Sequence, residues 1–235
     1  QTGIPFSQEY MERTLTAWPA IASGAVDLFA ARFDPALGEA QSAARKARIV
    51  GIEAGLATEL DKVTTLDEDR ILRRFINAMQ CTLRTNYFQG REWISFKIDS
   101  RSIDELPAPR PLVEVFVYSP RMEGIHLRGG RVARGGIRWS DRREDFRTEI
   151  LGLMKTQVVK NAVIVPTGSK GGFYVKQPPV GGTREQIQAE AIACYRTLIR
   201  GLLDITDNHV DGEMKPPAGV VRHDGAGWYA ERHRR

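Results

Sequence analysis

The chain has 235 residues, of which 42% are hydrophobic and 27% are charged, and its formal net charge is +5. These values are typical of a globular protein and argue against a disordered chain, and the length suits one large domain or two small ones. No apolar run reaches about 18 residues, so the sequence predicts no transmembrane span.

The N-terminus and the two cysteines bear on the origin and location of the chain. The sequence begins QTGIPFSQEY, with neither an initiating Met nor a signal-peptide pattern, which fits a piece of a longer polypeptide. Cys81 and Cys194 lie far apart in helical patterns, so we expect buried free thiols rather than a bridge or metal ligands. This cysteine usage predicts a reducing, cytoplasmic location.

Residues 1–90 are predicted to form helices. The segment QEYMERTLTAWPAIASGAVDLFAARFDP indicates two helices, separated near Pro19 and ended before Pro35. A long helix is expected next, over EAQSAARKARIVGIEAGLATELDKV. Thr65 and Glu68 form a capping-box pattern ahead of a further helix, DRILRRFINAMQCTLRTNYF. We expect this part of the chain to supply packing and subunit contacts and no catalytic chemistry.

The pattern changes at residue 91 from helical spacing to alternation. EWISFKIDS places Ile94, Phe96 and Ile98 on one face, and PLVEVFVYSP is rich in residues that favour strands. IHLRGG and GGIRW follow as shorter strands that are interrupted by glycine. These segments predict a β-sheet.

A helix is then expected to begin near Asp141, whose side chain can cap it while Glu144 reaches back, and to run through Ile150 towards Lys160. Its arginines, Arg147 among them, alternate with acidic residues, which is typical of an exposed first turn.

NAVIVPT predicts a short buried strand that ends at Pro166, and Phe173 to Val175 resume extended structure. Thr183 with Gln186 should cap a last long helix. The fold class is therefore α/β, with a helical segment over residues 1–90 and a mixed α/β sheet domain over residues 91–225. Residues 226–235 form an irregular basic tail.

Positive charge is concentrated in one part of the chain. Residues 121–160 contain ten Lys and Arg against five Asp and Glu, and the rest of the chain is balanced. This excess suits an anionic ligand, although a solvated face with local salt bridges would also account for some of the arginines.

The stretch from Leu127 to Lys176 carries the strongest functional pattern. Arg134, Lys160 and Lys170 each stand beside glycines or at the end of a predicted element. Glycine lets a backbone approach a ligand closely, and cationic side chains bind carboxylates. The pattern therefore predicts a site that holds a small dicarboxylate at both ends, with a lysine at its reacting carbon.

Three segments in this stretch resemble the glutamate dehydrogenases in sequence and order. ARGGIRW resembles the KGG-(I/L)-R segment of that family, with Arg134 in place of the usual lysine. TQVVKNAV resembles the helix with the substrate lysine, and VPTGSKGG resembles the loop with the catalytic lysine. Upstream, the resemblance is only to the large NAD-dependent (NAD-specific) glutamate dehydrogenases, and it extends back towards the helical N-terminus. The chain is similar to their substrate-binding region.

The resemblance implies a role for each matching residue. Arg134 would bind the side-chain carboxylate of glutamate, Lys160 with help from Gln157 would hold the α-carboxylate, and Lys170 would be the catalytic amine. Neighbouring cations favour the neutral form of a lysine, which can then take a proton or activate water. The remaining matched positions are glycines: Gly135 and Gly136 beside the substrate, and Gly168, Gly171 and Gly172 in the catalytic loop.

The implied activity is NAD-dependent oxidative deamination of L-glutamate to 2-oxoglutarate and ammonium, in a full-length protein expected to be a homo-oligomer. The 235 residues contain no GxGxxG motif, and no position matches the family's catalytic aspartate. We therefore expect the chain to be a fragment that lacks the nucleotide-binding domain, inactive alone but able to bind a dicarboxylate. The residues that contact the cofactor stay unknown.

Other interpretations of the same residues remain. Lys160 could simply be a lysine at a helix C-terminus that interacts with the helix dipole, and GSKGG could simply be a turn. Two RGG triplets and a basic composition could indicate an RNA-binding module, but apolar residues surround them at strand-like spacing, so we do not expect nucleic-acid binding. The four histidines show no ligand spacing, so no metal site is predicted.

Overall fold

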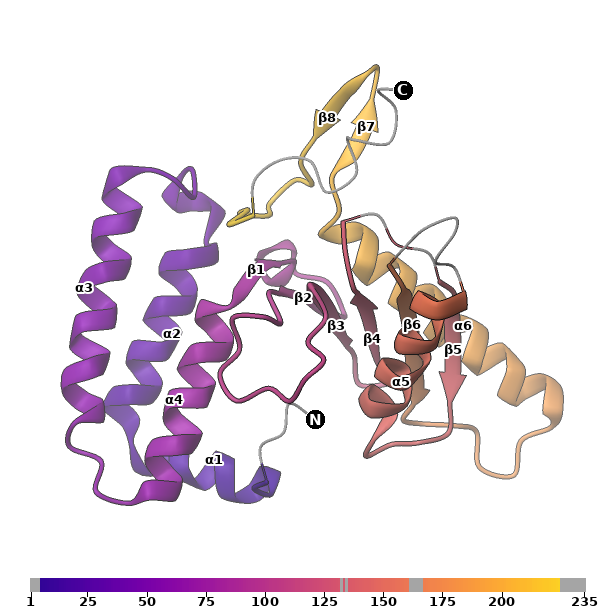
Figure 1. The fold of residues 1–235 in the computed structure, drawn as a ribbon, viewed down its shortest axis with the longest axis horizontal. Helices are drawn as coiled ribbons and strands as arrows, with labels where there is room; N and C mark the ends of the chain where they lie inside the picture. The colour runs from indigo at the N-terminus through magenta and orange to yellow at the C-terminus, as the bar shows by residue number, and fades with distance from the viewer. Residues whose placement is uncertain (1–4, 132, 134, 161–166, 225–235) are drawn as a thin grey trace.

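The computed structural model describes residues 5–131, 133, 135–160 and 167–224 (Figure 1). The α-helices are α1 (Gln8–Ala17), α2 (Pro19–Phe33), α3 (Ala43–Leu60), α4 (Leu66–Gln80), α5 (Phe146–Lys160) and α6 (Arg184–Asp204), and the 3₁₀ helices are η1 (Pro35–Leu37) and η2 (Tyr87–Gln89). The strands are β1 (Thr82–Thr85), β2 (Ile94–Ile98), β3 (Val113–Tyr118), β4 (Met122–Arg128), β5 (Ile137–Ser140), β6 (Ser169–Val175), β7 (Asn208–Val210) and β8 (Glu213–Lys215). This arrangement confirms an α/β fold in which N-terminal helices precede a mixed sheet.

Helices α1 to α4 lie together on one side of the molecule, and the sheet lies on the other (Figure 1). Ser7 caps α1 by accepting a hydrogen bond from the backbone N–H of Tyr10. Pro19 occupies the first turn of α2, where its missing N–H costs nothing. The helices bury a common apolar cluster that includes Leu28, Leu56 and Leu72. The predicted helix pair and the long third helix are confirmed.

The predicted capping box of α4 is wrong. Thr65 is the N-cap residue, but its side chain makes no capping hydrogen bond. Glu68 instead accepts a hydrogen bond from the indole N–H of Trp18 at 3.2 Å. The carboxylate therefore ties α4 to the junction of α1 and α2.

The helix that the sequence extends beyond Gln80 ends there, and residues 82–85 form the strand β1. Arg32 from α2 donates hydrogen bonds to the carbonyls of Gln80 and Thr82, each at 2.9 Å. These carbonyls therefore face a long-range partner, which local helical spacing does not reveal.

The larger sheet has the strand order β1-β2-β3-β4-β6-β5. Neighbouring strands from β1 to β6 are antiparallel, whereas β5 and β6 are parallel and are connected through α5. Strands β7 and β8 form a separate hairpin that projects from the body of the molecule (Figure 1).

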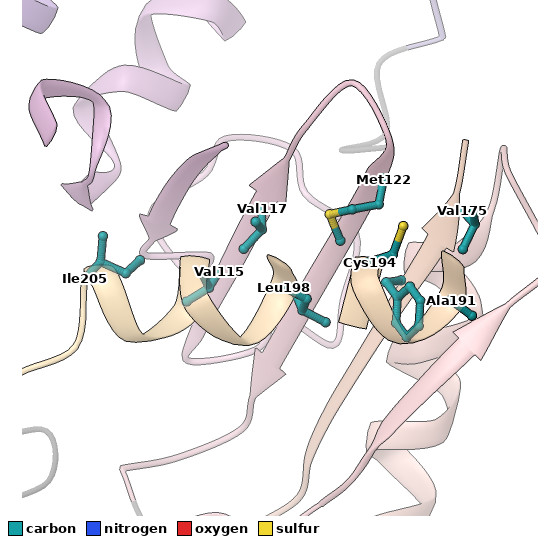
Figure 2. Close-up of a cluster of buried hydrophobic side chains, with 9 residues drawn as sticks. Val115, Val117, Met122, Val175, Ala191, Cys194, Leu198 and Ile205 are labelled. Carbon is teal, nitrogen blue, oxygen red and sulfur yellow. The ribbon is translucent and has the colours of Figure 1, made fainter. Parts of the chain in front are cut away.

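Helix α6 covers one face of the sheet. Figure 2 shows its side chains Ala191, Cys194 and Leu198 packed against residues of β3, β4 and β6. Gly124 on β4 permits this contact, because a Cβ there would lie 2.7 Å from Leu198 Cδ1. Cys81 and Cys194 are both buried free thiols, as predicted.

Helix α5 covers the opposite face. Phe146, Ile150 and Met154 bury against Ile125 and Leu127 of β4. The two helices on opposite faces complete the layered arrangement that an α/β sheet needs to bury both of its sides.

The prediction that α5 begins near Asp141 is wrong, because the helix begins at Phe146. The hydroxyl of Ser140 accepts a hydrogen bond from the N–H of Arg142 and donates one to Glu149. The chain therefore turns before the helix starts.

Arg147 was predicted to be exposed, and this is also wrong. Its guanidinium is buried and donates two hydrogen bonds to Glu114 of β3, at 2.9 and 3.0 Å. The acidic partner lies 33 positions away and is invisible to helical spacing. This ion pair attaches α5 to β3.

Three predictions concern the end of the chain. Thr183 and Gln186 form the expected capping box at the start of α6. Residues 161–166 of the predicted strand NAVIVPT and the tail 226–235 lie outside the described residues. Among the residues that the structure describes, no helix has both the length and the apolar character that crossing a membrane requires.

Arg45 on α3 closes the C-terminal end of α2. Its side chain is buried and donates to the carbonyls of Ala31, Arg32, Asp34 and Gly38, at distances of 2.7 to 2.9 Å. The last carbonyls of a helix have no partner within the helix, so this guanidinium replaces water there.

Replacing Arg45 by Gln should lower the free energy of unfolding by about 3 kcal/mol, because the buried carbonyls lose charged donors. Urea denaturation measures the change. The neighbouring exposed Lys46 offers a matched control, since Lys46→Gln should change stability by no more than about 0.5 kcal/mol. Equal, small effects of the two substitutions would contradict this role for Arg45.

Candidate functional site

The two glycine motifs of the sequence meet backbone to backbone where β5 and β6 begin. Ile137 of β5 is in register with Gly171 of β6, and the carbonyl of Gly136 accepts a hydrogen bond from the N–H of Gly171 at 3.0 Å. A Cβ at Gly135 would lie 1.5 Å from the carbonyl oxygen of Ser169. Only glycine at position 135 allows this approach of the two backbones.

The end of β4 joins the same edge of the sheet. The N–H of Gly129 donates to the carbonyl of Gly168 at 2.9 Å, and Leu127 is in register with Lys170. Gly129 and Gly130 of the first RGG triplet therefore lie in the segment that directly follows β4.

Lys170 lies in a strand and not in a loop. Lys170, Gly171 and Gly172 are part of β6, which begins at Ser169 rather than at Phe173 as expected. The loop placement of these residues was therefore wrong, and of the predicted loop glycines only Gly168 precedes the strand. Antiparallel pairing with β4 extends the strand through the glycines.

The α5 face of the sheet is the side on which the Cβ of Lys170 lies. A Cβ at Gly172 would contact Ile150 of α5 at 2.2 Å, and residues two apart along a strand share a face. Lys170 is half-buried there.

The last turn of α5 lies near the same edge. The helix follows β5 and precedes β6, and these strands are parallel, so α5 must run back from the ends of the strands to their starts. Gln157 and Lys160 are in its last turn. Their side chains, and all of Arg134, lie outside the described residues. The structure thus brings the three motifs to one edge of the sheet. Of their cationic side chains, it describes that of Lys170 but not those of Arg134 and Lys160.

Ion pairs hold α5 in this position. Arg138 of β5 bonds to Glu149 of α5, which also accepts the hydroxyl of Ser140. Together with the buried pair of Arg147 and Glu114, these contacts fix the start of the helix against β5 and β3. The position of the last turn follows from this fixed start, because the helix is continuous.

A buried charged cluster lies at the same end of the sheet, and the sequence analysis missed it. Arg84 of β1, which is 1% exposed, donates to both carboxylate oxygens of Asp207 and to Asp224. Lys97 of β2 also bonds to Asp224, and Arg222 bonds to Asp207 at 3.3 Å. Arg84 and Lys97 lie more than 100 positions from these carboxylates along the chain, so no local pattern could have revealed the cluster.

Burial in this region shifts two protonation equilibria. The pKa of Lys97 is lowered to about 8, chiefly by burial, while Asp224 opposes the shift. The pKa of His126 on β4 is lowered to about 4 by burial and by the charge of Arg128. His126 is therefore neutral at neutral pH.

Neither a nucleotide nor a metal ion finds a fitting site in the described residues. The described parallel pair, β5 and β6, encloses α5, but the turn between β5 and α5 is SDRRED and lacks the glycines that a dinucleotide pyrophosphate needs. Within the described ranges, no group of His, Cys, Asp and Glu has a geometry that could hold a metal ion.

Comparison with known sequences agrees with the motifs. The family described as "Bacterial NAD-glutamate dehydrogenase, catalytic domain" matches residues 55–230, which is more than half of the chain. The chain belongs to the NAD-glutamate dehydrogenase family. A second family, "Glutamate dehydrogenase, helical motif 3", matches residues 1–35 and so covers α1 and α2.

Curated members of this family are similar over almost the whole chain. The chain is 53% identical to the NAD-specific glutamate dehydrogenase of Pseudomonas aeruginosa over 95% of its own length, and 52% identical to that of Mycobacterium tuberculosis over 96%. The corresponding enzyme of Halomonas elongata is 51% identical over 95% of the chain. In each case the chain spans only 14% of the length of the glutamate dehydrogenase it matches.

Gly135→Ala should lower the free energy of unfolding by about 2 kcal/mol or more, because a methyl group cannot share space with the Ser169 carbonyl and β5 must shift. Gly136→Ala is the matched control, since a Cβ there meets nothing within 4 Å. Chemical denaturation of both variants checks the prediction. If the two glycines tolerate alanine equally well, β5 and β6 do not meet at Gly135.

Proposed function

We propose that this chain supplies the substrate-binding part of an enzyme that oxidatively deaminates L-glutamate to 2-oxoglutarate and ammonium, with NAD as the oxidant. The observation that carries the proposal is the backbone contact between the ARGGIRW and GSKGG segments at the start of β5 and β6. Two segments that resemble the two halves of one substrate site, and that are separated in the sequence by residues 140–167, thereby meet at one edge of the sheet.

The proposed binding roles follow the resemblance. Arg134 binds the side-chain carboxylate, and its planar guanidinium can do so through two hydrogen bonds where the family pattern has a lysine. Lys160, with Gln157, binds the α-carboxylate. Their shared turn at the end of α5 supports this pairing, since residues three apart on a helix face the same side.

Lys170 is the proposed catalytic amine. Its place on the α5 face, at the edge where α5 ends, supports a position beside the substrate carbon. In its neutral form the amine takes a proton from the substrate or activates the water that hydrolyses the imine. The described residues show no site for NAD, so we assign them only substrate binding and proton transfer.

We extend the proposal to the longer enzyme of which this chain would be a part. Residues 1–90 act mainly as a helical packing segment and residues 91–225 as the substrate-binding domain. The longer enzyme is a cytoplasmic homo-oligomer. The size of the family's members supports the view that other parts of the longer enzyme bind the nucleotide.

Calorimetry of 2-oxoglutarate binding to the 235-residue chain tests the proposal. Binding should be saturable, and Lys160→Ala should weaken it by about tenfold or more, because one charged hydrogen bond to a carboxylate is lost. Lys155→Ala is the matched control, since Lys155 is an exposed lysine on the same helix, and it should leave the affinity unchanged.

Circular dichroism establishes that each variant is folded before it is titrated. A folded chain that binds no 2-oxoglutarate, or one in which Lys160→Ala and Lys155→Ala bind equally well, would contradict the proposed site.

A further inference from the structure

A cavity of about 170 Å³ lies on the α6 face of the sheet, next to the charged cluster. A single ordered water needs only about 10–15 Å³ of such space, so the cavity has room for a larger guest. Its polar lining residues are Arg84, Lys97, His126, Arg128, Thr206 and Asp207, and apolar residues including Val115 and Leu202 close the remaining walls.

Cationic groups exceed carboxylates around this cavity. Arg84, Lys97 and Arg128 line it together with one acid, Asp207. Asp207 is already engaged by two hydrogen bonds from Arg84 and one from Arg222. Asp224, which bonds to Arg84 and Lys97, is not among the lining residues, so the lining itself presents more cations than carboxylates to a guest, which favours an anion.

Arg84 also retains hydrogen-bonding capacity. Its side chain is 1% exposed, and it donates through Nε to Asp224, through Nη1 to Asp207 and the carbonyl of Ile205, and through Nη2 to Asp207. A guanidinium has five N–H donors, so one N–H of Nη2 has no acceptor within the described part of the chain. A buried donor without an acceptor is costly, and an anion would satisfy it.

The protonation of the lining residues points the same way. Besides burial, the charge of Arg84 lowers the pKa of Lys97, and that of Arg128 lowers the pKa of His126. Both groups therefore experience positive potential, which a bound anion would reduce.

We propose that this cavity binds a small oxyanion of the size of inorganic phosphate, as a second site distinct from the glutamate site. The inference goes beyond the proposed function and does not depend on it. Arg84 and Lys97 provide the charge, Thr206 and His126 border the space, and Val115 and Leu202 exclude water from the apolar side.

The sheet separates this cavity from the glutamate site. His126 and Lys170 lie on adjacent strands, in register with Gly171 and Leu127 respectively. His126 lines the cavity on the α6 face, whereas the Cβ of Lys170 lies on the α5 face. One ligand of phosphate size cannot contact both side chains through the sheet.

Titration of the full 235-residue chain with inorganic phosphate, by calorimetry at fixed ionic strength, tests the proposal. We expect one phosphate to bind per chain. Lys97→Met should weaken phosphate binding by about tenfold or more. In this variant Asp224 keeps its bond to Arg84. Lys155→Met is the control for loss of one positive charge and should bind phosphate as the unmodified chain does. In NMR titrations, phosphate should raise the pKa of His126, because an anion stabilises imidazolium.

A second variant, Leu202→Phe, fills the cavity without removing a charge and should abolish binding while the chain stays folded. It decides the question if Lys97→Met does not fold. Absence of phosphate binding, or unchanged binding in Leu202→Phe, would overturn the proposal. Binding that is lost in Lys170→Ala but kept in Lys97→Met would place the anion in the glutamate site and would also overturn it. Since 2-oxoglutarate binding is measured separately with Lys160→Ala, failure of one site is distinguishable from failure of the other.

Discussion

The proposed substrate site depends on one contact, that between Gly135 and the carbonyl of Ser169. The described sheet is antiparallel from β1 to β6, and its parallel pair is the one closed by this contact. A parallel pair needs a crossover, so the helix between the strands must return to the edge where they begin. The sequence motifs on both strands and on the end of α5 are thereby gathered at one edge.

Buried ion pairs hold this arrangement on both faces of the sheet. Arg147 and Glu114 anchor α5, and Arg84 with Asp207 and Asp224 joins β1 to segments that follow α6. Breaking such a pair by removing one partner costs about 3–5 kcal/mol, because the other charge stays buried. A buried pair contributes little net stability compared with apolar residues, so its value here lies in fixing which segments are neighbours. Arg84 and Lys97, which line the α6-face cavity, belong to the second of these networks.

Local patterns predicted much of the fold and the order of the site motifs. The first three helices and the capping box at Thr183 each depend on residues near one another in the chain. Most of the errors have one cause, which is a partner distant in sequence. Glu68 bonds to Trp18 instead of capping α4, and Arg147 is buried where it pairs with Glu114. Antiparallel pairing with β4 places Lys170 in a strand. The charged cluster around Arg84 was invisible for the same reason.

We propose that the edge where β5 and β6 begin and α5 ends binds a dicarboxylate. A crystal structure of the chain with 2-oxoglutarate would test this proposal. We expect one carboxylate at Lys160 and Gln157, the other at Arg134, and the keto carbon beside the amine of Lys170. Density for 2-oxoglutarate elsewhere, such as in the α6-face cavity, with this edge empty, would contradict it.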